Sequence, residues 1–323
     1  MDARPQIGII GGGPAGLSAA LWLGNLGFSP WLVEATDRLG GMLNLNFLGN
    51  DWVLGQRDAT GPELAQRFSR HIEAGVARLW LNTCVTHVER AGDKFRITLN
   101  EDRQATAHAL LIATGTRYRG IEVLADVPGA ATLEPADVVC GPWAFAGLNA
   151  LRGRRVLTIG GGDNAFENAL LLAENGTSVD LAMRSASRAQ AALQEAVAAH
   201  ANCHVHAQAC LLELVRRDDG IEVALSDGCR IIVDRVHVLA GYEPNTSALA
   251  ELFGPLAAGL AFDANGYLRT DTAGRTGVGG VYACGDVCNP EFPSVVAALA
   301  QGARAARTIE RDLRQFLHSA PAR

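Results

Sequence analysis

Two glycine-rich segments in this chain each follow a short apolar run and precede an alanine- and leucine-rich run. The first reads Gly11-Gly12-Gly13-Pro14-Ala15-Gly16 after Ile7–Ile10, and the second reads Gly160-Gly161-Gly162-Asp163-Asn164-Ala165 after Val156–Ile159. In a strand–turn–helix unit, such glycines let the backbone approach a pyrophosphate, which the free N–H groups and the positive end of the helix dipole then bind. The sequence therefore predicts two Rossmann-type units and two bound dinucleotides.

The residues that would face each ribose differ between the two units. In the first, Glu34 ends the next apolar run, where a carboxylate accepts hydrogen bonds from a ribose diol. The matching place in the second unit holds Met183 and Arg184, with Arg188 close behind. No acid stands there to repel a 2′-phosphate, so the second unit is predicted to prefer NADPH to NADH.

The length and composition limit the class of protein. A chain of 323 residues has room for about two domains, and 48% hydrophobic residues supply their cores. The net charge of −6 argues against binding to nucleic acid or to an anionic membrane. The first apolar run begins at Ile7 and no run is long enough to cross a bilayer, so we expect a cytoplasmic protein. Seven cysteines, an odd number, indicate reduced thiols.

Further apolar runs complete the two units. Runs at Phe95–Leu99 and Ala109–Ala113 close the first, and runs near Ile221–Leu225 and Arg235–Leu239 close the second. The segment Ala240–Thr246 combines a strand-like run with a turn, and is predicted to lead the chain back into the first unit.

The last part of the chain adds one more strand and a helix. A buried strand is predicted at Val281–Ala283, followed by Gly285 and Asp286, and a helix is predicted to begin near Pro293 with this proline at its first position. This order makes the first domain split and the second an insertion.

These segments, in this order, resemble the low-molecular-weight thioredoxin reductase family of flavoproteins over nearly the whole chain. The resemblance implies an α/β fold with two Rossmann-type, three-layer ββα domains. A FAD domain would be formed by residues 1–117 and 242–323, with an NADPH domain at 118–241. Homodimers are usual in that family and are expected here.

The resemblance also assigns residues to each cofactor. Glu34 would contact the adenosine ribose, and Asp286 the ribityl chain of the flavin. The residues assigned to FAD are Gly11, Gly13, Pro14, Ala15, Gly16, Glu34, Gly40, Gly41, Thr114, Gly115, Gly285, Asp286 and Ser294. The residues assigned to NADPH are Gly160, Gly162, Asp163, Asn164, Ala165, Glu167, Arg184, Arg188 and Gly241.

The chain departs from that family at its redox centre. The family carries a Cys-x-x-Cys pair shortly before the second glycine motif, where this chain has Trp143-Ala144-Phe145-Ala146. Gly147 replaces the acid that follows the pair. Trp143, Phe145 and Ala146 would lie near the flavin, but an aromatic ring and a methyl group cannot open a disulfide. The arginine pattern that clamps the 2′-phosphate is also reduced, to Arg184 and Arg188.

The remaining cysteines offer weaker redox candidates. Cys140 precedes the replaced pair, and Cys284 and Cys288 flank Gly285-Asp286. We interpret Cys284 as a small core residue and Cys288 as a loop thiol. No metal site is predicted, because Cys203, Cys229, His200, His204 and His206 have no spacing typical of a compact four-ligand site.

Three hypotheses for function follow. The first is an enzyme that moves hydride from NADPH to FAD and then electrons to an external acceptor, either a small electron-carrier protein of the ferredoxin or flavodoxin type or a small molecule. Leu151–Arg155 and Asp163 resemble ferredoxin- and flavodoxin-NADP reductases of this architecture, although the short C-terminal segment differs from theirs. The second is a disulfide reductase that uses unconventional cysteines. The third is a non-catalytic, flavin-loaded binding or sensing module.

Overall fold

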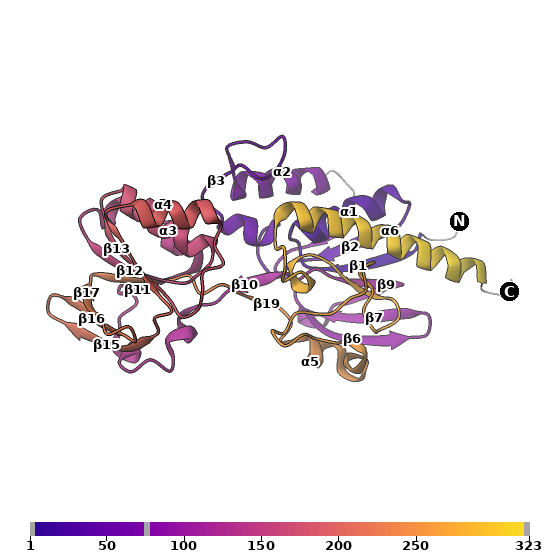
Figure 1. Ribbon diagram of the computed structural model, residues 1–323. Helices are drawn as coiled ribbons and strands as arrows, with labels where there is room; N and C mark the ends of the chain where they lie inside the picture. The colour runs from indigo at the N-terminus through magenta and orange to yellow at the C-terminus, as the bar shows by residue number, and fades with distance from the viewer. Residues whose placement is uncertain (1–3, 74–77, 320–323) are drawn as a thin grey trace. The chain divides into compact units, whose positions relative to one another are not determined.

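The computed structural model describes residues 4–73 and 78–319. The chain divides into two compact units. The first unit comprises the chain up to Arg117 together with the chain from Glu243 onward, and the second unit comprises Tyr118–Tyr242. The sequence predicted these divisions after residues 117 and 241. Figure 1 shows that each unit has its own sheets and helices.

The first unit is built on a parallel sheet with the strand order β20-β9-β1-β2-β5. Its strands are β1 (Gln6–Ile10), β2 (Ser29–Val33), β5 (Arg78–Trp80), β9 (Ala109–Ile112) and β20 (Val281–Ala283). All four pairings are parallel. In a parallel sheet the carboxyl ends of all strands meet at one edge, which is where this unit places its glycine-rich loop.

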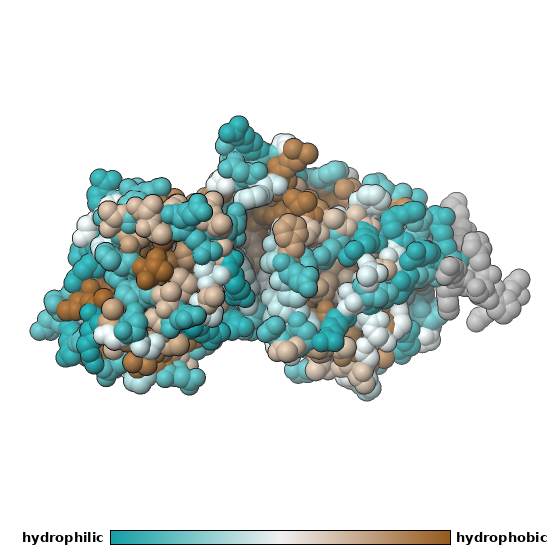
Figure 2. Space-filling model, in the orientation of Figure 1, coloured by the Kyte–Doolittle hydropathy of each residue, from teal (hydrophilic) through white to brown (hydrophobic). Residues whose placement is uncertain are grey.

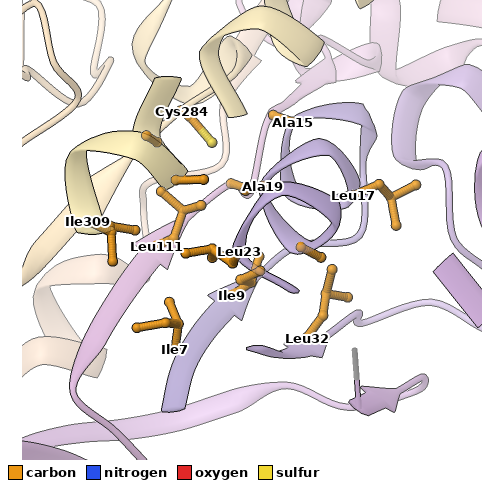
Figure 3. Close-up of a cluster of buried hydrophobic side chains, with 14 of the residues drawn as sticks. Ile7, Ile9, Ala15, Leu17, Ala19, Leu23, Leu32, Leu111, Cys284 and Ile309 are labelled. Atoms are coloured by element: carbon orange, nitrogen blue, oxygen red, sulfur yellow. The ribbon is translucent and has the colours of Figure 1, made fainter. Parts of the chain in front are cut away.

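Helices cover one face of this sheet and a second sheet covers the other. On the helical face, α1 (Pro14–Asn25) and α6 (Val295–Ser319) pack over alternate residues of β1 and β9, such as Ile9 and Leu111 (Figure 3). On the opposite face, Ile10 and Ile112 pack against Phe95 and Ile97. The covering antiparallel strands are β6 (Val85–Ala91), β7 (Lys94–Leu99) and β8 (Gln104–Ala107).

The second unit repeats the three-layer plan. Its parallel sheet has the order β11-β18-β12-β13-β14. The helices α3 (Asp163–Glu174) and α4 (Ala191–Ala199) share a core with Val179 and Leu181. The strands of the parallel sheet are β11 (Val138–Cys140), β12 (Arg155–Ile159), β13 (Ser178–Met183), β14 (Cys203–Ala207) and β18 (Arg235–Val238).

An antiparallel sheet forms the third layer of the second unit. Its strands are β15 (Leu211–Arg217), β16 (Gly220–Leu225) and β17 (Arg230–Val233). Leu214 and Val223 from this layer share a core with Leu157 and Ala182 of the parallel sheet. The predicted fold class, α/β with two Rossmann-type ββα units, is confirmed.

The remaining strands are short. Strand β10 (Thr116–Tyr118) pairs with β19 (Tyr242–Pro244), so the outgoing and returning chains run together at the boundary between the units. The first unit also has β3 (Gly49–Asn50), β4 (Ala59–Thr60), α2 (Gly61–Glu73) and α5 (Leu249–Phe253). Within residues 4–73 and 78–319, no helix has the length and apolar character needed to cross a membrane.

The predicted start of the last helix is wrong by two residues. Pro293 is not its first position, because α6 begins at Val295. Ser294 caps the helix instead: its hydroxyl accepts a hydrogen bond from the backbone N–H of Ala297 at 3.1 Å, and its carbonyl accepts one from Ala298 at 2.9 Å. A serine hydroxyl satisfies an otherwise unpaired N–H of the first turn, which a proline ring cannot do.

Candidate functional site

The glycine loop of the first unit is so tightly packed that side chains are excluded. Gly11 has a φ of +111°, and a Cβ there would lie 2.3 Å from the carbonyl oxygen of Ala113. A Cβ on Gly16 would lie 2.0 Å from the carbonyl oxygen of Gly11. Gly13 forms the N-cap of α1 without a side-chain hydrogen bond. The first N–H groups of the helix therefore remain available to an anion such as a pyrophosphate.

Glu34 is held beside this loop by three hydrogen bonds. Its Oε2 accepts from the N–H of Gly12 at 2.8 Å, and its Oε1 accepts from the N–H and the hydroxyl of Thr36, each at 2.9 Å. The residue is only 9% exposed. Its carboxylate is thus fixed at the end of β2, the position from which an acid binds a ribose diol.

Two further glycines pack against the same loop. Gly40 has a φ of +113° and donates its N–H to the carbonyl of Gly12 at 2.8 Å. A Cβ on Gly41 would lie 3.1 Å from the Cα of Gly13. The turn at 40–41 therefore closes over the glycine loop and leaves backbone, rather than side chains, facing it.

Residues from both halves of the split unit meet at this edge of the sheet. The Thr114 hydroxyl donates to the carbonyl of Asn245 at 3.0 Å, and Asn245 in turn donates its N–H to the carbonyl of Gly115 at 3.0 Å. A Cβ on Gly285 would lie 2.7 Å from the Cβ of Ala15, so the segment after β20 lies against the start of α1.

Asp286 carries an unsatisfied buried oxygen. Its Oδ1 is shielded from water and has no hydrogen-bond partner among the described residues. Burial raises the pKa of this carboxyl to about 6. A buried acceptor without a donor costs free energy unless a ligand supplies the donor. The sugar-like hydroxyls of a ribityl chain are such donors, so the glycine cradle, Glu34 and Asp286 fit a flavin dinucleotide.

The second glycine loop repeats the tight turn. Gly160 has a φ of +150°, and a Cβ there would lie 2.3 Å from the carbonyl oxygen of Leu239. The Asp163 carboxylate accepts hydrogen bonds from the N–H of Gln190 at 2.7 Å and from its side chain at 3.2 Å. Arg188 donates its N–H to the carbonyl of Gly161 at 2.7 Å. The segment after β13 therefore folds back onto the glycine loop.

The basic residues predicted to contact NADPH lie on this segment. Arg184 directly follows β13, and both Arg184 and Arg188 are exposed. Gly162 is the N-cap of α3, and Ala165 is buried within the first turn of that helix. The place where a dinucleotide ribose would lie is thus flanked by guanidinium groups and not by a carboxylate on β13.

Polar and aromatic groups line the start of α3. Asn164 donates to the hydroxyl of Tyr242 at 2.6 Å, and the rings of Tyr118 and Tyr242 are 4.6 Å apart. Burial raises the pKa of the Glu167 carboxyl, and the charge of Asp163 adds to this shift. Gly241, with a φ of +88°, turns the chain just before β19. The sequence did not single out the two tyrosines.

The segment that replaces the dithiol forms a short turn after β11. Trp143 and Phe145 lie on a 3₁₀ helix, Gly141–Phe145, and Trp143 is 58% exposed. Ala146 follows it directly. Cys140 ends β11, and burial raises the pKa of its thiol.

A buried polar network holds this turn. The side-chain N–H of Asn168 donates to the carbonyl of Ala144 at 2.8 Å. The side-chain oxygen of Asn168 lies 3.0 Å from Nδ1 of His237 and accepts from the Thr158 hydroxyl at 3.2 Å. All three side chains are at most 1% exposed. No sequence pattern predicts this network, because its members are isolated polar residues within apolar runs.

This network predicts a loss of stability in acid. Burial lowers the pKa of His237 to about 4, with a smaller contribution from Arg235. An unfolded chain binds the proton near pH 6.5 and the folded chain only near pH 4, so stability falls as the pH drops through that window, by up to about 3 kcal/mol. His237→Gln keeps a hydrogen-bond donor but cannot titrate. Urea unfolding between pH 7 and pH 4 should show a shallower loss for this variant.

The matched control is His204→Gln, which removes an exposed histidine from the same unit. It should leave the pH dependence of stability unchanged. Equal slopes for the wild type and His237→Gln would contradict the assignment.

Cys284 and Cys288 are not arranged as an accessible dithiol. Cys284 is 1% exposed and packs in the apolar core with Ala15, Ala19 and Ile309 (Figure 3). Burial raises the pKa of Cys284 strongly and that of Cys288 to about 11. This placement agrees with the interpretation of Cys284 as a core residue.

Of the cysteines and histidines considered for a metal, the structure brings two together. His206 and Cys229 lie close to each other and to Asp227, which the sequence analysis did not consider. Cys203 instead packs partly against the core, and His204 is exposed. The grouping was missed because it joins β14 to a turn between two strands of another sheet.

Comparisons with known proteins agree with this geometry. Residues 5–302 match the family described as pyridine nucleotide-disulphide oxidoreductase. The thioredoxin reductase of Lactococcus lactis has a TM-score of 0.81 with 26% identity, over 97% of this chain and 100% of that chain. The thioredoxin reductase of T. acidophilum gives 0.80 with 25% identity, over 96% of this chain and 100% of that chain.

Curated relatives are longer proteins. A component of the alkyl hydroperoxide reductase from Pseudomonas aeruginosa is 28% identical over 311 residues, which cover 92% of this chain and 56% of that protein. The chain therefore spans little more than half the length of such relatives. Since the family match covers most of this chain, the chain belongs to the pyridine nucleotide-disulphide oxidoreductases, and its fold is similar to that of thioredoxin reductases.

Proposed function

We propose that this enzyme takes hydride from NADPH onto FAD and delivers the electrons to an external acceptor without an internal dithiol. The observation that carries the proposal is the turn Gly141–Phe145, which has no thiol and is fixed by Asn168 and His237. Bound FAD would supply the redox chemistry, because a flavin accepts hydride and can then pass electrons to an acceptor. The chain's own residues bind and orient the two dinucleotides.

The residues proposed to hold FAD supply complementary contacts. The N-terminal amides of α1 would hold the pyrophosphate, Glu34 would hold the ribose, and the orphaned Oδ1 of Asp286 would accept from the ribityl chain. The N-terminus of α6, capped by Ser294, has a positive helix end that would favour negative charge on a bound flavin.

An anaerobic titration tests the proposal. Stoichiometric NADPH should bleach the bound FAD, and NADH should do so more slowly. The reduced protein should then be mixed with ferredoxin, flavodoxin, quinone and thioredoxin in turn. Fast reoxidation by a one-electron carrier or a quinone supports the proposal, whereas absent bleaching would favour a non-catalytic flavin-binding module.

NADPH preference is expected to depend on Arg184. The guanidinium is exposed at the end of β13, and a charge-assisted hydrogen bond to a 2′-phosphate there strengthens NADPH binding alone. Arg184→Ala should lower the ratio of kcat/KM for NADPH over NADH by about tenfold, with kcat/KM for NADH unchanged. Steady-state kinetics with both nucleotides measures this ratio.

Arg230→Ala is the control, since Arg230 is exposed on β17 and pairs with Glu222. It should leave the ratio as in the wild type. If Arg184→Ala keeps the wild-type ratio of kcat/KM for NADPH over NADH, Arg184 does not bind the 2′-phosphate.

Protein partners are also proposed, a second copy of the chain and a small electron carrier. The first unit exposes large apolar side chains, and Figure 2 shows brown surface among the teal near β3 and the start of α6. Trp52, Leu54, Phe292 and Val296 are the exposed residues of these segments. Apolar surface of this kind is typical of protein contacts. Sedimentation of the wild type and of Trp52→Ser/Leu54→Ser measures whether the surface is needed for self-association.

A further inference from the structure

Three potential metal ligands meet at the edge strand of the second unit. His206 lies on β14, and Asp227 and Cys229 lie on the turn between β16 and β17. One ligand atom from each, the imidazole nitrogen, a carboxylate oxygen and the thiol sulfur, lies within 4.8 Å of the other two. Nδ1 of His206 is 2.9 Å from Oδ2 of Asp227.

The second nitrogen of the histidine is already engaged. Nε2 of His206 lies 2.8 Å from Oδ1 of Asp180 on β13, the neighbouring strand. A histidine that binds a metal usually gives its other N–H to a carboxylate, which fixes the ring and makes the coordinating nitrogen more basic. Asp180 is placed to do this, and Nδ1 then faces Asp227 and Cys229.

Hydrogen bonds within the turn also hold Asp227 and Cys229 in positions suited to metal coordination. Oδ1 of Asp227 accepts the backbone N–H of Cys229 at 2.9 Å, which orients the carboxylate and leaves Oδ2 toward His206. The backbone of Leu225 donates to the carbonyl of Cys229 at 2.9 Å, so the cysteine lies in a closed turn. Asp227 and Cys229 are exposed, so a hydrated ion can reach the cluster.

We propose that His206, Asp227 and Cys229 bind one zinc-class divalent ion, with Asp180 as the positioning carboxylate and water as the fourth ligand. Nitrogen, sulfur and carboxylate donors together are typical of zinc. Bonds of about 2.0–2.3 Å to a tetrahedral ion require donor atoms roughly 3.5 Å apart. The His206–Asp227 pair, at 2.9 Å, opens by roughly 0.6 Å and the thiol sulfur moves in by up to about 1.3 Å, through rotation of the exposed Cys229 and Asp227 side chains.

The ion would join two layers of the second unit. His206 belongs to the outermost strand of the parallel sheet, and Asp227 and Cys229 belong to the antiparallel layer. An ion that binds the folded chain but not the unfolded chain stabilises the fold by mass action. The site is therefore structural in character and independent of the proposed electron transfer.

The alternative is a metal-free ion cluster, in which a protonated His206 donates both N–H groups to Asp180 and Asp227. In that arrangement the thiol only donates a hydrogen bond to Asp227, which a serine hydroxyl at the same position would also do. A coordinated ion needs the sulfur and displaces the proton from Nδ1. Cys229 therefore distinguishes the two.

The test uses the full-length, FAD-loaded protein after treatment with a chelator. Cobalt(II) serves as the optical probe, because its tetrahedral d–d bands lie at longer wavelength than flavin absorption, and zinc is then added in competition. We expect one ion per chain and a zinc-dependent rise in Tm. Cys229→Ser and His206→Ala should each weaken binding at least tenfold, and Asp180→Asn by about 10- to 100-fold.

Two matched variants serve as controls. Cys210→Ser removes an exposed thiol beside the same turn. The backbone N–H of Cys210 donates to the hydroxyl of Ser226, which precedes Asp227. His204→Ala removes an exposed imidazole from the same strand. Both should bind cobalt like the wild type. Absence of a tetrahedral spectrum, or cobalt affinity that is unchanged in Cys229→Ser, would overturn the proposal. Flavin bleaching by NADPH, recorded on the same samples, reports separately on the proposed function.

Discussion

Replacing Asp286 by asparagine is expected to weaken FAD binding by about 10- to 100-fold and to stabilise the FAD-free protein. The carboxylate would accept hydrogen bonds from flavin hydroxyls, and a hydrogen bond to a charged group contributes about 1.5–3 kcal/mol. Asparagine keeps one acceptor oxygen but no charge. The dissociation constant, measured by flavin fluorescence on apoprotein, should rise accordingly.

Asp286→Asn is expected to stabilise the FAD-free protein, although it weakens FAD binding, because Oδ1 of Asp286 is buried and has no hydrogen-bond partner among the described residues. The pKa of Asp286 is raised to about 6, so its charged form is disfavoured in the folded state. For a carboxyl raised in this way, the cost to the folded state grows as the pH rises from about 4 to 6 and is complete above 6. Asp286→Asn should therefore raise the free energy of unfolding at pH 8 by up to about 3 kcal/mol.

Two measurements make this prediction specific. Urea unfolding of the apoprotein should show the gain at pH 8 and little of it near pH 4. FAD should bind the wild type more tightly as the pH rises from 5 to 7, because its hydroxyls favour the ionised carboxylate, and Asp286→Asn should lack this dependence. Asp51→Asn, a change at an exposed acid of the same unit, should alter neither. If Asp286→Asn binds FAD as tightly as the wild type does, Asp286 does not contact the flavin.

The sequence predicted features that depend on a single residue in a single backbone conformation. Gly11 and Gly160 occupy turns with positive φ where a Cβ would strike a carbonyl, so the motif itself reports the geometry. Glu34 was located by its place at the end of a strand, and the structure holds it against the glycine loop. The continuous apolar runs at Ile7–Ile10 and Val156–Ile159 located the buried central strands β1 and β12.

Features that depend on register between distant strands could not be predicted. His206 meets Asp227 only because β14 lies at the edge of one sheet and the β16–β17 turn reaches it from another layer. Asn168 similarly joins a helix to His237 on β18. No local pattern marks such pairs, since each member is an ordinary polar residue in its own element. The sequence predicted Pro293 as the first residue of α6, whereas the adjacent Ser294 caps the helix.

Electron transfer is expected to survive the loss of Cys140, Cys284 and Cys288 together. Only a thiolate attacks a disulfide, and burial raises the pKa of all three thiols, that of Cys288 to about 11. At pH 7.5 roughly one Cys288 in a thousand, or fewer, is ionised. The turn that bears Trp143 offers no sulfur either. Under the proposed function, the flavin would therefore pass electrons directly to its acceptor.

The variant to test is Cys140→Ser/Cys284→Ala/Cys288→Ser. Alanine is chosen at Cys284 because a hydroxyl buried among Ala15, Ala19 and Ile309 would lack a partner and lower stability. NADPH oxidation with a one-electron dye or a quinone should stay within about twofold of the wild type, since the thiols take no part in it. Thioredoxin should be a poor acceptor for both proteins. NADPH-reduced wild type should show no long-wavelength thiolate-to-flavin absorption, and thiol counts before and after reduction should agree. Rapid thioredoxin reduction by the wild type that is absent in the triple variant would instead establish a disulfide reductase with unconventional cysteines.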